Sequence, residues 1–477
     1  HRSRAMADAL LRAPTAEELA AGLRGGASRQ RVEASYTPRH QRFRVKKKAF
    51  TQQYSHVYTK RLWAMRQQLR QRAVAATGGE VHVVDKIMEL QEGVRSVIIG
   101  TTYKNMKLKP SVLDEFSEER ALGAPIVPAE NITSDDDTIV LEDDTGRARL
   151  VGPAAHPHTM VTGVTIAALG ALDARGEFHL EQYLPLGLLP HPAAGIVADP
   201  PTYVLIASGL EIGGPASSQF PAMLLGDYLG GRLGGAADAE LASRVCRVVL
   251  AGNCVSAPDP SVLAERHLSQ AQQRQLAEPL ELFDVTVTQI LSSVACDIMP
   301  GKNDPANFTL PQQPLHPCLL PNASRFNTLS CVTNPYEAFI GGRAFVGSSG
   351  QPVESMLQQT RAPDGPGAQE DASLRALHCM LEWGHLAPTA PDTLPCYPFY
   401  EEDPFVMDSC PHVLFAGNQP SFATKVVQGP AGQAVRLVSV PRFSLRGEVV
   451  LVELSSLECT LLSVAGPSPA ERVAEGL

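Results

Sequence analysis

The chain has 477 residues, 44% of them hydrophobic, which is enough for two or three domains, and its 38 glycines and 38 prolines indicate a β-rich fold with many turns. Its net charge of −9 argues against a dedicated nucleic-acid-binding protein, which would normally carry a strongly basic domain. Nine cysteines without C-x-x-C spacing argue against a disulfide framework or a zinc knuckle, and no apolar run is long enough for a membrane span, so we expect reduced thiols and no membrane contact.

The N-terminal region is basic, with 17 Lys and Arg against four Asp and Glu in residues 1–73. Residues 1–36 show no apolar periodicity and are expected to form a disordered arm. A helix is predicted after it, because apolar residues recur at steps of three and four and would share one buried face: Phe50, Tyr54, Val57, Tyr58, Leu62, Met65 and Leu69. The basic residues of this stretch are expected mostly elsewhere on the helix: Lys60, Arg61, Arg66, Arg70 and Arg72. The basic residues then either contact nucleic acid or form a solvated face.

Alternating apolar residues predict five short strands in the next ninety residues. They form a strand at Ser96–Met106 and two hairpins, at Thr138–Gly152 and Val164–Tyr183, with turns at Asp143–Gly146 and near Asp173–Gly176. This pattern is typical of a small Greek-key barrel of the OB type, so a helix plus OB domain is predicted at 37–185. Because its strands hold few aromatic residues and its turns are acidic, protein docking is favoured, with single-stranded DNA binding as the alternative.

A Pro- and Gly-rich linker is predicted at 186–201, a second domain at 202–460 and a tail at 461–477. The second domain repeats an apolar strand that ends in a small-residue loop, with helical stretches between, such as Phe220–Leu229 and Pro260–Leu276. The repeats predict a sheet covered by helices, whose ligand site would lie at the strand ends. A mobile insertion is predicted at 361–371. The four strands with their loops are Tyr203–Gly209, Arg247–Asn253, Ala295–Gly301 and His412–Asn418.

In this order, the four loops resemble those of calcineurin-like metallophosphoesterases, a family that uses two metal ions held by carboxylates and histidines. The resemblance implies an α/β phosphoesterase sandwich, but it fails where the ligands belong. An amide such as Asn253 bridges two cations poorly, and at 4 Å Lys302 would cost on the order of 4 kcal/mol for each unit of cationic charge facing it. The residues at the ligand positions are Gly209, Glu211, Asn253, Ser256, Lys302, Asn303, Asn418 and Pro420.

The part of the loop pattern that this sequence retains is its glycines, Gly252, Gly301 and Gly417, together with Asp304. We therefore expect a preserved architecture with no catalytic residue, no metal and no cofactor, and an active phosphoesterase with unusual ligands as the alternative. His385 falls roughly where the family has an isolated histidine, and is interpreted as a hydrogen-bonded core residue.

Three long stretches resemble the small, B-type subunits of eukaryotic replicative DNA polymerases, and most of all the family of DNA polymerase delta small subunits. They are Asp297–Pro321, His385–Phe405 and Cys410–Pro430, and shorter similar stretches occur at Tyr54–Arg66, Ile98–Glu119 and Cys331–Ala338. The resemblance spans about 40–460 and implies an α+β multidomain protein, in which a helix and an OB-fold β-barrel precede an inactive phosphoesterase sandwich.

The same resemblance implies the role of a nuclear, non-catalytic scaffold in DNA replication and repair synthesis. It would join the C-terminal metal-binding module of the catalytic subunit of DNA polymerase delta to a third accessory subunit, and through them act with the sliding clamp on primer-template DNA. The B-type small subunit of another replicative polymerase is the alternative within this class.

Overall fold

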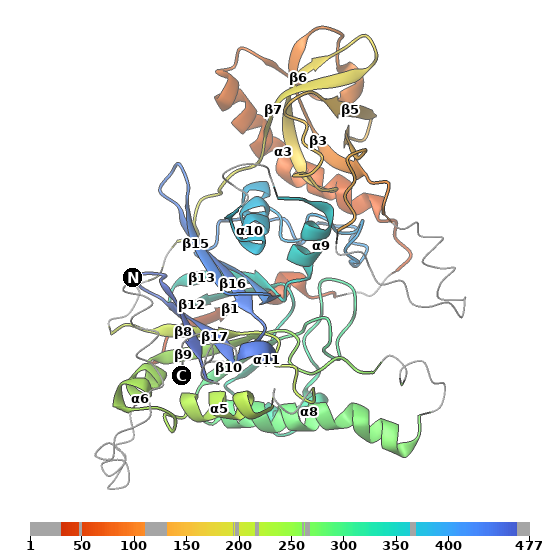
Figure 1. Cartoon of the computed structure of the whole chain (residues 1–477). Coiled ribbons are helices and arrows are strands. Elements are labelled where there is room, and N and C mark those ends of the chain that lie inside the picture. Colours follow the sequence, from red (N-terminus) through yellow and green to blue (C-terminus); the bar gives the residue numbers. More distant parts are fainter. Residues whose placement is uncertain are drawn as a thin grey trace.

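The computed structural model describes residues 30–46, 50–109, 131–193, 195, 200–214, 219–259, 262, 268–362 and 369–464. These residues form two bodies in contact, a small sheet with one long helix and a larger sandwich of two sheets (Figure 1). Most of the predicted arm at 1–36, all of 363–368 in the predicted insertion, and most of the predicted tail lie outside the described residues.

The first body is a sheet that closes on itself. Its order is β2-β3-β4-β5-β7-β6, and because β3 also pairs with β6, five of the strands form a ring of pairings. The long strand β3 makes this possible by pairing with β6 over 95–101 and with β4 over 101–105. The predicted strand and both hairpins are confirmed. The strands are β2 (His82–Val84), β3 (Arg95–Asn105), β4 (Thr138–Glu142), β5 (Arg147–Val151), β6 (Thr165–Leu172) and β7 (Glu177–Leu184), with a short η2 helix (Ile87–Glu89).

The predicted helix is α3 (Ser55–Thr77), which ends where Gly78 takes up a left-handed conformation. Its apolar face is buried, as predicted, and it packs on the ring of strands through Leu62, Met65 and Leu69. The prediction is wrong at Phe50 and Tyr54, which precede the helix and are 68% and 47% exposed.

The second body is a sandwich of two six-stranded sheets. The four predicted strands are confirmed. Those within Tyr203–Gly209, Arg247–Asn253 and Ala295–Gly301 are parallel neighbours in one sheet, and that within His412–Asn418 lies in the other. One sheet contains β11 (Leu329–Cys331), β10 (Ala295–Met299), β9 (Val245–Ala251), β8 (Tyr203–Ala207), β17 (Glu448–Glu453) and β18 (Cys459–Ser463). The other contains β1 (Tyr36–Pro38), β12 (Tyr336–Ile340), β13 (Arg343–Ser348), β14 (Val413–Gln419), β16 (Ala434–Pro441) and β15 (Ala423–Gln428).

Helices cover the outer face of each sheet (Figure 1). The predicted helix at Phe220–Leu229 is confirmed as α5. The predicted helix at Pro260–Leu276 is confirmed from Gln270 onward, where the side chain of Ser269 caps the start of α8, and most of 260–267 lies outside the described residues. The helices are α5 (Gln219–Leu229), α6 (Ala236–Ser243), α8 (Gln270–Leu291), α9 (Gln351–Gln359), α10 (Ala372–Trp383) and α11 (Phe443–Arg446), with short η1 (His40–Phe43), η4 (Pro317–Leu319) and η5 (Ala323–Arg325).

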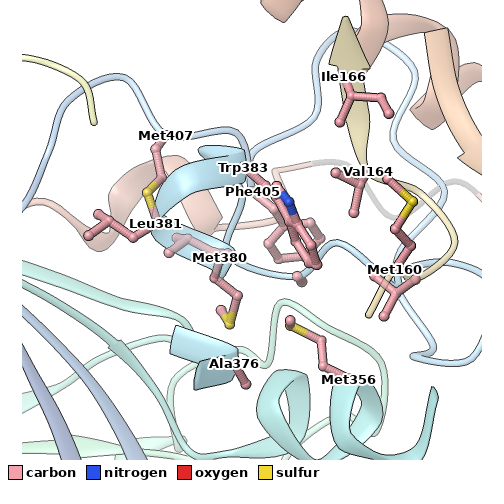
Figure 2. Packing of buried hydrophobic residues seen from close by; sticks show 14 of the residues in the cluster. Met160, Val164, Ile166, Met356, Ala376, Met380, Leu381, Trp383, Phe405 and Met407 are labelled. Atoms are coloured by element: carbon pink, nitrogen blue, oxygen red, sulfur yellow. The ribbon is translucent and has the colours of Figure 1, made fainter. Parts of the chain in front are cut away.

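One hydrophobic cluster joins the two bodies. Met160 and Val164 come from the first body, Met356 from α9 and Trp383 from α10, and they lie together with Phe405 in Figure 2. Apolar burial of this kind stabilises the contact, so the two predicted domains share a core.

The described ends of the predicted segments are held in place. Arg31, in the predicted arm, donates hydrogen bonds to the carbonyl oxygens of Ala242 and Val245. In the predicted linker, the backbone N–H of Gly187 donates to Glu382, and β18 extends to Ser463 within the predicted tail. The nine cysteines are all free thiols. Among the described residues, no helix combines the length and the apolar character that crossing a membrane requires.

Candidate functional site

The loops that follow β8, β9 and β10 meet the end of β14. The backbone N–H of Gly209 donates to the carbonyl oxygen of Gly252 at 2.9 Å, and that of Asn303 donates to Oδ1 of Asn253 at 3.1 Å. The side-chain amide of Asn418 donates to the carbonyl oxygen of Ala251 at 3.3 Å. Four segments far apart in the sequence are thus connected at one place.

Three non-glycine residues in these loops have a left-handed backbone, with φ of 48° at Glu211, 52° at Asn253 and 58° at Asn418. This conformation is unfavourable for side chains with a Cβ, and asparagine tolerates it better than most. Hydrogen bonds hold it at Asn418, whose side-chain amide also donates to Ser349 at 2.8 Å while its backbone N–H donates to Oγ of Ser208 at 2.8 Å. The loop shape is therefore fixed by contacts within the protein.

Asp304 connects the β9 loop to the β10 loop. One carboxylate oxygen accepts from the backbone N–H of Gly301 at 2.7 Å, and the other accepts from Cys254 at 2.8 Å and Val255 at 3.0 Å. Burial raises the pKa of Asp304 to about 6, although the N–H donors favour the charged form. With these donors on both oxygens, the carboxylate of Asp304 holds the backbones of the two loops together.

The other predicted positions are dispersed. Glu211 accepts a hydrogen bond from Ser444 at 2.8 Å, and the exposed Lys302 lies 3.7 Å from Glu354. Ser256 is half-buried and Pro420 is exposed. Within the described ranges, no three His, Cys, Asp or Glu side chains are grouped so that they could share a metal ion.

His385 lies in another place, at the contact between the two bodies. Its Nε2 is 3.0 Å from Asp403, which also accepts from Nε of Arg61 at 2.8 Å. Burial, together with the charge of Arg61, lowers the pKa of His385 to about 4. Burial alone would raise the pKa of Asp403, but Arg61 and His385 outweigh it and lower that pKa below its usual range. The interpretation of His385 as a hydrogen-bonded core residue agrees with these contacts.

Sequence reasoning missed Arg61. This side chain of α3 is fully buried and donates to Gly163 at 2.6 Å in the first body, and to Pro388 at 2.9 Å and Ala390 at 2.8 Å in the second. The expectation that it lies off the apolar stripe is wrong. The spacing in the sequence indicates the buried position, because Arg61 is four residues after Val57 and four before Met65 and therefore shares their face of the helix.

Two protein-family models match the chain. Residues 53–183 match the "DNA polymerase delta subunit OB-fold domain", which covers α3 and the ring of strands. Residues 204–424 match the family of the B subunits of DNA polymerases alpha and epsilon, and this match begins within β8 and ends in β15. The chain thus consists of an OB-fold domain and a second domain.

Curated relatives match nearly the whole chain. The "DNA polymerase delta small subunit" of Arabidopsis thaliana is 40% identical over 435 residues, which is 91% of this chain and 96% of that protein. The "DNA polymerase delta subunit 2" of Drosophila melanogaster is 38% identical over 441 residues, 91% and 98% of the two chains. The small subunit of Saccharomyces cerevisiae is 31% identical over 454 residues, 88% and 91%. The chain therefore belongs to the family of DNA polymerase delta small subunits.

Proposed function

We propose that this chain is a non-catalytic accessory subunit of DNA polymerase delta, which acts in the nucleus as a scaffold. The observation that carries the proposal is the 40% identity to a DNA polymerase delta small subunit over 96% of that protein's length. The ring of five strands supports an OB-type barrel for the first domain, and the helix-covered sandwich supports a phosphoesterase-like second domain.

The side chains at the four strand ends do not fit a pair of divalent cations. A two-metal centre needs a bridging carboxylate, yet Asn253 offers an amide whose oxygen already accepts from Asn303. Both oxygens of Asp304 accept backbone N–H groups, and Asn418 donates to backbone carbonyl oxygens. We infer that the phosphoesterase chemistry has been lost and that protein hydrogen bonds support the loops instead.

A scaffold needs parts that keep their relative positions. The shared hydrophobic cluster and the contacts of Arg61 would give the two domains one rigid arrangement. On this frame, the chain would bind the C-terminal metal-binding module of the catalytic subunit and the third accessory subunit. Contact with the sliding clamp and primer-template DNA would be indirect.

Co-expression tests the partner. The tagged chain is produced together with the catalytic subunits of replicative polymerases from the same organism, and the purified complexes are identified by mass spectrometry. We expect the catalytic subunit of DNA polymerase delta in a stable complex, which is lost when its C-terminal module is removed. Recovery of another polymerase's catalytic subunit instead would favour the alternative family member, and recovery of the chain alone would contradict the proposal.

A hydrolysis assay tests the loss of chemistry. With an activated phosphodiester and Mn²⁺, we expect no turnover above that of the heat-denatured chain. Turnover that Asp304→Asn abolishes would show an active phosphoesterase.

A further inference from the structure

A cavity of about 210 Å³ lies between α3 and the first sheet, away from the four strand ends. Tyr58 and Trp63 of α3 line it on one side, and Tyr103 of β3 lines it on another. Trp63 is 58% exposed, an unusual position for the largest aromatic side chain in a folded protein. The turn between β4 and β5 completes the cavity with carboxylates, among them Glu142 and Asp144.

The acidic side chains at this turn differ in their hydrogen-bond and ion-pair partners. Asp143 serves the turn itself, because its oxygens accept from the backbone N–H groups of Thr145, Gly146 and Ile87. Glu142 pairs with the exposed Arg147 at 2.8 Å, and its pKa is raised by burial. Asp144 is exposed and makes no hydrogen bond or ion pair with another described residue. Spare acceptor capacity on the rim therefore lies at Asp144, while Glu142 is shared with Arg147.

The aromatic rings of the cavity already attract cations of the chain itself. The ammonium group of Lys60 lies 5.1 Å from the centroid of Trp63, and the guanidinium group of Arg147 lies 5.9 Å from that of Tyr103. The guanidinium group of Arg61 lies 5.3 Å from the ring of Tyr58. Aromatic faces together with carboxylates are the combination that recognises an ammonium or guanidinium group.

We propose that this cavity binds one arginine or lysine side chain presented by a partner protein. Three aromatic walls would hold the aliphatic stem and the cation, while Glu142 and Asp144 would pair with its charge. The volume is comparable to that of one long side chain. A nucleic-acid strand is disfavoured, because its phosphates would face carboxylates. The inference concerns this side-chain site and does not depend on which polymerase subunit is the partner.

Fluorine NMR tests the site directly, because the chain has two tryptophans and they report on different places. Trp63 lines the cavity, whereas Trp383 is buried in α10 and serves as an internal control for folding. The full chain is labelled with 5-fluorotryptophan, and Trp63→Phe assigns the two signals. The probes are acetyl-Gly-Arg-Gly-amide and its citrulline counterpart, which has nearly the same shape without the charge.

We expect the arginine peptide to shift the Trp63 signal in a saturable, salt-sensitive way and to leave the Trp383 signal unchanged. The citrulline peptide should cause little shift. In the double variant Glu142→Gln/Asp144→Asn, binding should weaken by about tenfold, which corresponds to about 1.4 kcal/mol. The control Glu181→Gln, on an exposed side chain of β7, should bind as the natural chain does.

Three results would overturn the proposal. The first is a Trp63 signal that does not shift at saturating arginine peptide. The second is an equal shift with the arginine and citrulline peptides. The third is unchanged binding of the arginine peptide by the double variant, with a Trp383 signal that shows this variant to be folded. A Trp63 shift produced by oligo-dT rather than by the arginine peptide would assign the cavity to nucleic acid.

Discussion

Ionisation of Asp304 lowers the stability of the folded chain. The carboxyl group is buried, and burial raises its pKa from 3.8 to about 6. A group whose pKa is higher in the folded than in the unfolded chain binds more protons when folded, so its contribution is complete below about pH 4 and is lost as the pH rises to about 6. The change amounts to about 3 kcal/mol for a shift of this size. The hydrogen bonds to three backbone N–H groups explain why a carboxylate is nevertheless kept there.

The variant Asp304→Asn cannot titrate, so it removes this dependence. The free energy of unfolding of the natural chain, minus that of the variant, should fall by about 3 kcal/mol between pH 3 and pH 7, and about 2 kcal/mol of this fall should occur between pH 4 and pH 6. Urea unfolding at several pH values measures the difference. The variant Asp408→Asn, at a side chain 84% exposed, is the control for removing a carboxylate from the surface. A difference for Asp304→Asn that stays constant with pH would refute the assignment.

Part of the candidate site could be predicted from single residues at the eight ligand positions of the four loops. The absence of carboxylates and histidines at Gly209, Asn253 and Asn418 is visible in the sequence, and so are the glycines that shape the loops. The sequence did not predict that these residues hydrogen-bond to one another, because the hydrogen bond from Asn418 to Ser349 depends on how two strands of the sandwich are placed. For the same reason, the sequence did not predict that the carboxylate of Asp304 joins the backbones of two loops.

At the scale of one element, α3 belongs to both domains. Its apolar face packs on the first sheet, and Arg61 reaches through to Asp403, Pro388 and Ala390 in the second body. A buried guanidinium group is stable only if its donors are satisfied, and here four hydrogen bonds supply acceptors.

Replacing Arg61 with methionine should therefore lower the free energy of unfolding by about 3–5 kcal/mol, because Asp403 would be left as an uncompensated buried charge. Chemical denaturation at pH 7 measures the loss. The control Arg70→Met, on the same helix, removes only a surface ion pair with Asp85 and should cost less than about 1 kcal/mol. In an Asp403→Asn background, Arg61→Met should cost clearly less. An equal loss of unfolding free energy in Arg61→Met and Arg70→Met would show that Arg61 does not hold the two domains together.

Elements with a regular pattern and a local partner were predictable. The hairpins β4–β5 and β6–β7 follow from period-two alternation around short acidic or glycine-containing turns. The strands β13, β16 and β17 were missed although each forms a hairpin with a neighbouring strand, β12, β15 or β18. They are buried along most of their length, so they lack the period-two alternation that marks a strand with one exposed face. The start of α8 at Gln270 depends on the cap at Ser269, a local signal that the apolar pattern alone did not reveal.

At the scale of the whole molecule, the shared cluster predicts cooperative unfolding of the two domains. Trp63 reports on α3 and Trp383 on α10, so the fluorescence of the single-tryptophan variants Trp383→Phe and Trp63→Phe follows each body separately. Their urea midpoints should coincide with each other and with the loss of far-ultraviolet circular dichroism. Two midpoints that differ by more than the error would mean that the domains unfold independently.

We infer that the sandwich keeps the shape of a two-metal site without the groups that hold the metals. Anomalous diffraction from crystals of the chain soaked in Mn²⁺ tests it most directly. We predict no pair of anomalous peaks among Gly209, Asn253, Asp304 and Asn418. Two peaks about 3.5–4 Å apart at these strand ends would contradict it, because that spacing defines a two-metal centre.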